Sequence, residues 1–358
     1  MDTSDPEIRF DENGYCNHCT AALERLRNTP FRRDKSSLER LIQEVKEKGR
    51  NKKYDCIIGV SGGVDSSYVA HRVKTAGLRP LAVHLDNGWD SELAVKNIEN
   101  ICKLLNIDLS TYVIDWEEFK DLQLSFLRAS TPDSEIPSDH AITAILYKTA
   151  IKEDVKYILA GVNTATEAIL PNAWSRGHAD WKYIKSIQKQ LGSKELKTFP
   201  HYSIFELMKF KLIEGIKWVN FLDYVDYNRQ EAKEIIQKEI DWRDYGLKHY
   251  ESVYTKFFQG YILPKKFGFD KRRAHLSSLI CAGQITREQA LEEMKKEIYP
   301  PQDVKQDIEY VINKFGLTKE EFEAIMKALP KTYWDYPNYQ KTLYYRLAKK
   351  VYRFVRRR

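Results

Sequence analysis

A short segment rich in glycine and serine carries the strongest chemical signal in the sequence: Ser61, Gly62, Gly63, Val64, Asp65, Ser66 and Ser67. It follows an apolar run at 55–60, typical of a strand buried on both faces, and it leads into a helical pattern at 66–76. Adjacent glycines permit backbone conformations and close approach that side chains would forbid. The N–H groups of such a turn and helix start, together with the serine hydroxyls, can bind an anion. The segment therefore predicts a phosphate-binding loop.

The acidic residue within this loop indicates what accompanies the phosphate. Asp65 would repel a bare phosphate, so its natural partner is a Mg²⁺ ion that bridges phosphate oxygens. The loop lacks the lysine of the G-x-x-x-x-G-K-[ST] pattern, so it is no Walker loop. An ordinary glycine turn capped by Asp65 or Ser66 is the plainer alternative, which the length and placement of the pattern disfavour. We predict phosphate binding, with Asp65 as a catalytic magnesium ligand.

The surrounding elements alternate in a way that fixes the fold class. Further strand patterns at 80–85, 109–114 and 157–162 are separated by helical patterns at 91–105 and 139–153. This alternation predicts an α/β fold with a parallel twisted sheet, whose ligands lie beyond the carboxyl ends of the strands. From residue 171 the alternation fades, and a mostly helical second half is predicted, with helical character at 203–219, 227–239, 286–296, 301–315 and 319–328.

These patterns divide the chain into four parts. We expect an N-terminal segment at 1–50, an ATP domain at 51–200, a helical substrate or partner region at 201–339, and a basic amphipathic tail at 340–358.

The loop SGGVDSS resembles the PP-loop of the ATP pyrophosphatase superfamily, whose members split ATP into AMP and pyrophosphate. The resemblance implies a Rossmann-like sheet of the adenine nucleotide alpha hydrolase type, with ATP and Mg²⁺ bound at its edge. It also implies nucleotide contacts at the ends of the second and fourth strands. Asp139 is one further candidate for a nucleotide contact, although it could simply cap the start of a helix. The residues expected to contact the nucleotide outside the loop are His84, Asp86, Asp139, His140, Gly161 and Asn163.

Three further stretches narrow the resemblance. They are the opening at 1–19 with its CNHC, WRDYGLKHYES at 242–252, and FGFDKRRAHLSSLI at 267–280 followed by GQITRE at 283–288. Together they resemble the N-acetyl sugar amidotransferases of bacterial surface-polysaccharide and nonulosonic-acid pathways. That family implies conversion of an acetamido group on a nucleotide-activated N-acetyl sugar into an acetamidino group. ATP would adenylate the amide oxygen and ammonia would displace AMP, in the synthesis of a lipopolysaccharide O-antigen or a related glycan.

Two clusters of charged residues in these stretches are candidates for the chemistry. Lys271, Arg272 and Arg273, followed by His275, would stabilise the departing pyrophosphate, or they form a solvated basic helix start. The second cluster would bind the sugar or accept the proton lost by ammonia, or it is a surface turn; it consists of Lys248, His249 and Glu251.

The cysteines indicate neither a glutaminase nor a complete metal site. Cys56, Cys102 and Cys281 lie in apolar patterns typical of buried structural thiols, so ammonia needs another source. The family resemblance implies separate subunits similar to the glutaminase and cyclase of imidazole glycerol phosphate synthase. Cys16 and Cys19 form half of a zinc site, since structural zinc needs four ligands and relatives carry a further C-x-x-C upstream. Either zinc is bound at Cys16 and Cys19 or the site is lost.

Composition and charge bound the remaining possibilities. Five scattered cysteines, an acidic opening and no apolar stretch of about 18–20 residues favour a cytoplasmic protein. The net charge of +7 becomes −1 without 340–358, which holds eight basic and no acidic residues, so a nucleic-acid partner is not expected. Apolar residues recur at helical spacing in this tail. The pattern predicts either a helix docked on its own domain or attachment to an acidic partner or to the anionic surface of the inner membrane. Two other functions stay open: a PP-loop enzyme that adenylates a tRNA base, and a non-catalytic nucleotide-binding scaffold.

Overall fold

The computed structural model describes residues 1–246, 250–343 and 345. Its centre is a parallel sheet in the order β3-β2-β1-β4-β5. The strands are β1 (Cys56–Gly59), β2 (Pro80–Asp86), β3 (Asp108–Val113), β4 (Tyr157–Ala160) and β5 (Lys217–Asn220). The predicted α/β class with a parallel sheet is confirmed. The strand order reverses between β1 and β4, so this is the point where a ligand of such a sheet is expected.

The fifth strand corrects the sequence-based assignment of 203–219 as helical. Helix α10 (Ile204–Leu212) ends early, Gly215 adopts a φ of +65°, and β5 then pairs with β4. Four residues are too short for a periodic strand signal, and only the neighbouring strand fixes their conformation. The sheet therefore continues past residue 200, where the sequence-based division ends the ATP domain.

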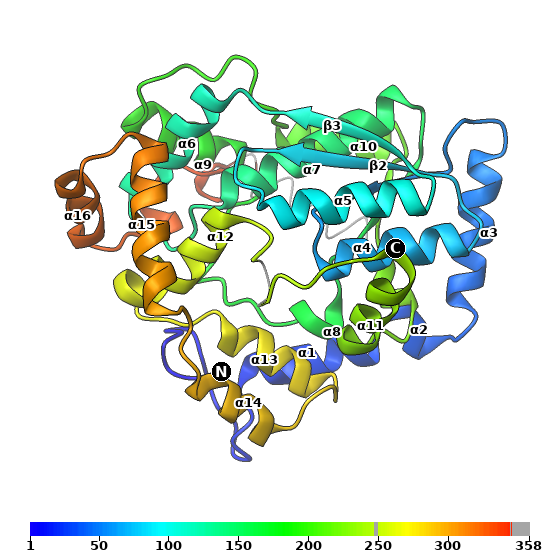
Figure 1. Cartoon of the computed structure of the whole chain (residues 1–358), viewed down its shortest axis with the longest axis horizontal. Coiled ribbons are helices and arrows are strands. Elements are labelled where there is room, and N and C mark those ends of the chain that lie inside the picture. Colours follow the sequence, from blue (N-terminus) through cyan, green and yellow to red (C-terminus); the bar gives the residue numbers. More distant parts are fainter. Residues whose placement is uncertain (247–249, 344, 346–358) are drawn as a thin grey trace.

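Helices cover both faces of this sheet (Figure 1). On one face lie α3 (Ser37–Gly49), α4 (Val64–Thr75), α5 (Glu92–Leu104) and α11 (Arg229–Ile240), which share a hydrophobic cluster with the sheet. The other face packs against α6 (Trp116–Ala129), α7 (Ile136–Lys152), α9 (Trp181–Leu191) and α10. Side chains cap several of these helices at their first turns; Ser91, for example, accepts a hydrogen bond from the N–H of Ala94 at the start of α5.

The C-terminal half is mostly helical, as predicted. Two helices lie near the N-terminus, α1 (Asn17–Arg27) and α2 (Pro30–Arg33). The short helix α8 (Thr164–Glu167) comes after β4, and the 3-10 turn η1 (Phe221–Tyr224) comes after β5. The later elements are α12 (Val253–Phe257), the π-helical η2 (Phe258–Phe267), α13 (Arg272–Cys281), α14 (Arg287–Lys295), α15 (Pro301–Phe315), α16 (Lys319–Lys327), η3 (Tyr333–Asp335) and η4 (Tyr339–Lys341). Helices α1, α13 and α14 lie together below the sheet in Figure 1.

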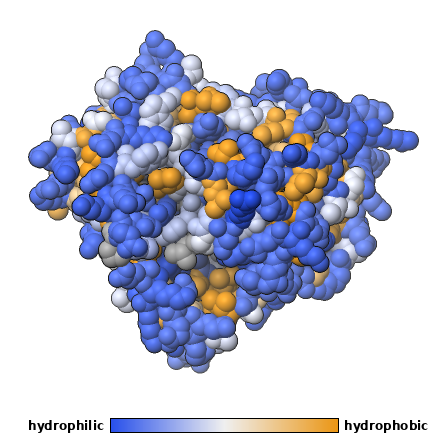
Figure 2. Space-filling view, in the orientation of Figure 1, coloured by the Kyte–Doolittle hydropathy of each residue, from blue (hydrophilic) through white to orange (hydrophobic). Residues whose placement is uncertain are grey.

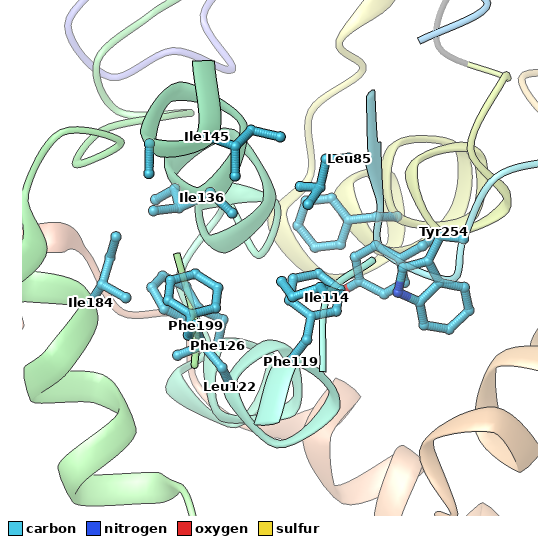
Figure 3. Close-up of a cluster of buried hydrophobic side chains, with 14 of the residues drawn as sticks. Leu85, Ile114, Phe119, Leu122, Phe126, Ile136, Ile145, Ile184, Phe199 and Tyr254 are labelled. Carbon is cyan, nitrogen blue, oxygen red and sulfur yellow. The ribbon is translucent and has the colours of Figure 1, made fainter. Parts of the chain in front are cut away.

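One hydrophobic core joins the sheet to these C-terminal helices. Figure 3 shows Leu85 and Ile114 from the strand ends meeting Phe119 of α6, Ile136 of α7 and Tyr254 of α12. Fully burying one such side chain contributes about 1.5–3 kcal/mol, so this core fixes α12 firmly against the sheet. The chain just before α12 is thereby held close to the carboxyl ends of the strands.

On the face drawn in Figure 2, hydrophilic residues predominate and the hydrophobic ones form separate patches. Among the residues that the structure describes, no helix is long and apolar enough to cross a membrane. Most of the predicted basic tail at 340–358 lies outside the described residues.

Candidate active site

The predicted phosphate loop lies at the switch point of the sheet. It connects β1 to α4, whose N-cap is Gly63, and Gly62 has a φ of +75° that favours glycine. The end of β4 approaches the same turn closely. A Cβ atom on Gly161 would lie 3.2 Å from both the carbonyl carbon of Asp65 and the amide nitrogen of Ser66. The structure therefore brings Gly161 next to the loop, and its contact with a nucleotide stays a prediction.

Buried side chains outside the loop bind one of its backbone carbonyl groups. The carbonyl of Gly62 accepts hydrogen bonds from Trp242 Nε1 at 2.8 Å and from Asn97 Nδ2 at 3.4 Å. Asn97 is fully buried and also exchanges hydrogen bonds with the backbone of Arg243. These contacts hold the carbonyl of Gly62 and stabilise the turn conformation of the loop.

The three serines of the loop do different things. Ser67 is buried, and its hydroxyl donates to the carbonyl of Gly63 at 2.6 Å, so it stabilises the helix start. Ser61 and Ser66 instead place their Oγ atoms 3.2 Å apart at the more exposed edge of the loop. Ser61 and Ser66 are therefore the hydroxyl groups best placed to meet a phosphate.

Two tyrosines and a second carboxylate surround the loop. The Tyr227 hydroxyl donates to Asp65 Oδ1; burial and the negative charge of Asp65 raise the pKa of Tyr227. A Cβ atom on Gly63 would lie 3.3 Å from both Glu251 Oε1 and the Tyr245 hydroxyl. Burial and the charge of Glu251 raise the pKa of Tyr245, which stays protonated. Two carboxylates beside a phosphate loop suit a phosphate that arrives with a cation.

Glu251 reaches the loop because its backbone is tied to the turn after β2. The N–H of Ser91 donates to the carbonyl of Glu251 at 2.9 Å, and Asp90 and Ser252 form an isolated antiparallel bridge. The prediction that Glu251 belongs to the site is compatible with this position. The residues predicted with it, Lys248 and His249, lie outside the described residues.

The candidate nucleotide contacts on β2 and β4 mainly hold the backbone of the site. His84 binds the carbonyl of Val60 through Nδ1 at 3.0 Å and Asp90 through Nε2 at 3.2 Å. Burial lowers the pKa of His84, but Asp90 outweighs burial and the net pKa is raised. Asp86 caps the following turn through the N–H of Gly88, and Asn163 caps α8. These contacts leave nucleotide binding by His84, Asp86 and Asn163 as a prediction.

His140 is placed as a structural residue. It is fully buried, its Nδ1 contacts the carbonyl of His178 at 2.7 Å, and its Nε2 accepts from the N–H of Tyr202 at 3.2 Å. Its ring stacks on Tyr202 with a centroid distance of 4.3 Å. Because backbone groups occupy both ring nitrogens, no nitrogen of His140 remains for a nucleotide, and the predicted contact has no support here.

Its neighbour Asp139 belongs to a small ionic cluster. His178 Nε2 lies 3.3 Å from Asp139 Oδ2 and 3.3 Å from Asp133 Oδ2. Burial lowers the pKa of His178, but the two carboxylates outweigh this and raise it to about 10, so the imidazole is charged. Asp139 is exposed on the first turn of α7 and does not cap the helix. Its predicted nucleotide contact stays open.

The buried imidazole of His140 predicts an acid-sensitive stability. Burial lowers its pKa from 6.5 to about 4. Between these values the unfolded chain binds a proton that the folded chain does not. The stabilisation is complete above pH 6.5 and decreases toward pH 4, by about 2 kcal/mol between pH 7.5 and pH 5. His140→Gln should reduce this pH dependence, measured by urea unfolding at both pH values. An unchanged pH dependence in the variant would contradict this assignment.

A cavity of about 210 Å³ lies between the loop-bearing part and α13. Its wall combines cationic, hydrogen-bonding and apolar side chains, so it suits a polar organic ligand. Two lining residues of the cavity are close in sequence to residues that contact the loop. Arg229 is two residues after Tyr227, which binds Asp65, and Gly246 comes directly after Tyr245, which faces Gly63. The lining residues are Thr166, Arg229, Gly246, Tyr250, Gln259, Gly260, Asp270, Lys271, Arg272, His275, Leu276, Leu279, Glu293 and Ile298.

The three predicted basic residues at the start of α13, which are Lys271, Arg272 and Arg273, differ in their contacts. Arg272 is bound bidentately by Asp270 and also donates to the carbonyls of Glu293 and Lys296, so it braces the cavity wall. Arg273 pairs with Asp2 at 2.9 Å and does not line the cavity.

Lys271 lines the cavity and lies near two carboxyl groups of the connection between α6 and α7, those of Asp133 and Glu135. Burial raises the pKa of Glu135, and the positive charge of Lys271 opposes this effect. Asp133 has its pKa lowered despite burial, by His178 and then by the charge of Lys271. Lys271 is therefore the member of the basic group best placed to act in the cavity.

The N-terminal cysteines meet a third cysteine rather than a metal site. The Sγ atoms of Cys16 and Cys19 lie 3.3 Å apart, and the thiol of Cys19 is hydrogen-bonded to Cys281 at the end of α13, which lowers the pKa of Cys281. Cys102 and Cys281 are only partly buried, so the prediction of a buried thiol holds for Cys56 but not for these two. Across the described part of the chain, no group of three or more His, Cys, Asp or Glu residues could hold a metal ion. The predicted zinc site at Cys16 and Cys19 is not supported.

Magnesium fits the loop in another way. Mg²⁺ is commonly held by one or two carboxylates together with substrate phosphates and water, so it needs no preformed cage of protein ligands. Asp65 stands in the first turn of α4 and is followed by Ser66, whose Oγ lies 3.2 Å from that of Ser61. The donor set of the loop therefore suits a magnesium-bound phosphate.

Fold and loop together define an α/β protein whose predicted phosphate loop lies at the switch point of a parallel sheet. Residues 251–352 match the family model described as LPS biosynthesis protein WbpG-like, C-terminal domain. The matched part begins at Glu251 and includes α13, so it supplies one wall of the cavity. Among curated proteins, none matches the chain.

Two solved structures are similar over the larger part of the chain. An NMN synthetase from Francisella tularensis has 15% sequence identity and a TM-score of 0.30, covering 60% of this chain and 97% of the other. An NH3-dependent NAD synthetase from Campylobacter jejuni subsp. jejuni NCTC 11168, in complex with the nitrate ion, has 16% identity and a TM-score of 0.30, covering 59% of this chain and 97% of the other. Values this low do not decide a shared activity.

Proposed function

We propose that this chain is an ATP-dependent amidotransferase that converts the acetamido group of a nucleotide-activated N-acetyl sugar into an acetamidino group, in the synthesis of a lipopolysaccharide O-antigen or a related surface glycan. The observation that carries this proposal is the loop at 61–67 beside a cavity whose far wall matches the WbpG-like domain. The loop supports ATP as a substrate, and the matched domain supports the glycan context.

The chemistry explains why one protein would join these two features. An amide carbon is a poor electrophile, so its oxygen must first become a leaving group. The acetamide oxygen forms a bond to the α-phosphorus of ATP, while the bond from that phosphorus to the β-phosphate oxygen breaks and pyrophosphate leaves with the electron pair. Ammonia then bonds to the activated carbon, AMP departs with the electrons of the carbon–oxygen bond, and the nitrogen loses protons.

Residues of this chain would assist each stage. The amides at the start of α4 and the hydroxyls of Ser61 and Ser66 would bind the pyrophosphate portion of ATP. Mg²⁺ held by Asp65 would neutralise charge on the phosphates. Glu251, which lies beside Gly63, would accept a proton from the attacking nitrogen. The cavity would hold the acetamido sugar, with Lys271 in its wall.

Ammonia would come from separate glutaminase and cyclase-like subunits. Ammonium is not a nucleophile, and the sequence contains no glutaminase pattern. The free chain should therefore need a high concentration of an ammonium salt at alkaline pH.

Pyrophosphate release tests the proposal. With MgATP, we expect release to increase at least about tenfold only when a UDP-linked N-acetyl hexosamine, or its uronic acid, and ammonium chloride are both present. The matched control is the same UDP-sugar with a free amino group in place of the acetamido group, which should give no increase. Release that is equal without the acetamido sugar, or that responds to tRNA instead, would refute the proposed reaction.

A further inference from the structure

Arg229 occupies a fixed position between the phosphate loop and the cavity. It is the first residue of α11, whose N-cap is Asn228. The side chain of Gln284, just after α13, binds the chain on both sides of this cap: Arg229 N–H donates to Gln284 Oε1 at 3.0 Å, and Gln284 Nε2 donates to the carbonyl of Tyr227 at 2.7 Å. One side chain thus fixes both Tyr227, which contacts Asp65, and Arg229, which lines the cavity.

The guanidinium group of Arg229 lacks a protein partner within the described residues. Its Nε atom is buried and has no hydrogen-bond acceptor there, and none of the described carboxylates forms an ion pair with it. Arg272 in the same cavity wall differs, because a carboxylate and two carbonyls hold it. A buried guanidinium donor without an acceptor is costly, which is a reason to expect that a ligand supplies the acceptor.

The positive charge of Arg229 also reaches the loop. Burial is the main cause of the raised pKa values of Tyr227 and Tyr245, and the charge of Arg229 opposes that rise in both. Tyr227 binds Asp65 and Tyr245 faces Gly63, so the guanidinium lies close to the phosphate loop as well as in the cavity wall. An anion shared between the loop and the cavity would meet this group.

We propose that Arg229 is a catalytic residue that binds the α-phosphoryl group as it passes from ATP to the acceptor in the cavity. This inference rests on the proposed function. As the acceptor oxygen bonds to phosphorus and pyrophosphate leaves, negative charge spreads over the other phosphoryl oxygens, and a planar guanidinium can bind two of them at once. Lys271 is less suited to this role because the carboxyl groups of Asp133 and Glu135 lie near it.

The test is the Arg229→Ala variant of the full chain, with Arg243→Ala as the matched control. The side chain of Arg243 is 62% exposed and pairs only loosely, at 3.7 Å, with Asp241. We expect Arg229→Ala to lower pyrophosphate release about 100- to 1,000-fold. The dissociation constant of a non-hydrolysable ATP analogue should change less than about tenfold, and millimolar guanidinium should restore part of the rate. The control variant should keep the wild-type rate.

Pyrophosphate release within about threefold of wild type in Arg229→Ala would overturn the inference. If that variant fails to fold, Arg229→Lys and Arg229→Gln decide: a faster rate with lysine supports a role for the charge, and equal rates refute it. Each rate is measured with the acetamido sugar and also without it, where water attacks the α-phosphorus in its place and AMP and pyrophosphate are the products. If pyrophosphate release by the wild-type protein does not depend on the sugar, the proposed function is refuted. The ratio of the variant rate to the wild-type rate in hydrolysis without the sugar still tests the role of Arg229.

Discussion

Asp65→Ala should lower the rate of pyrophosphate release by about 1,000-fold or more, because the carboxylate would hold the magnesium ion that neutralises the leaving pyrophosphate. The fold should survive, since Asp65 lies in the first turn of α4 and is only partly buried. The measurement is a coupled pyrophosphate assay at saturating MgATP, with circular dichroism as the check on folding.

The matched control for this prediction is Tyr227→Phe. This change removes the hydroxyl that donates to Asp65 but keeps the ring against Tyr68, at a centroid distance of 5.7 Å. Losing one hydrogen bond to a charged group costs about 1.5–3 kcal/mol, so the rate should fall by no more than about 10- to 150-fold. A near-normal rate in Asp65→Ala would show that the loop does not bind a magnesium-bound phosphate.

Gly62→Ala should damage both stability and activity. Gly62 has a φ of +75°, and a Cβ atom there would lie 2.5 Å from the carbonyl oxygen of Ala94. The left-handed conformation costs about 1–2 kcal/mol for a residue with a side chain, and relieving the contact must move α5 or the loop itself. We expect the free energy of unfolding to decrease by about 3 kcal/mol and ATP binding to be lost.

Gly215→Ala separates the effect of the left-handed backbone conformation from the effect of the contact with Ala94. Gly215 has a φ of +65°, but no atom lies within 4 Å of a Cβ atom built there, and it lies in the turn before β5. This variant should lose only about 1–2 kcal/mol and keep its activity. Urea unfolding and the pyrophosphate assay on both variants give the comparison; equal effects of the two substitutions would mean that the approach of α5 to Gly62 does not matter.

The centre of the fold could be predicted because its signals are local. A buried apolar run, a glycine pair and a helix start are contiguous in the chain, and they place the loop between β1 and α4 as the structure does. The fifth strand could not be predicted, because residues 217–220 are too few for a periodic pattern and become a strand only beside β4. The end of a helix after Leu212 also gives no strong signal until Gly215.

The site was only partly predictable, because several of its contacts join residues that are distant in the sequence. The segment at 242–252 was selected by its resemblance, yet the residues that touch the loop within it include Trp242 and Tyr245, which look like ordinary aromatic residues in sequence. Arg229 follows a helix cap and carries no pattern of its own. Its significance arises from Gln284, which is distant in sequence and fixes its backbone.

The fate of the acetamide oxygen tests the central claim most directly. If this oxygen attacks the α-phosphorus of ATP, then an acceptor labelled with a heavy oxygen isotope in its acetamido group should give AMP that carries the label in its phosphate. The label is read by phosphorus NMR or mass spectrometry after turnover with MgATP and ammonia. We predict one labelled oxygen in each AMP formed. Unlabelled AMP, produced while the acetamido group keeps its heavy oxygen, would contradict the account.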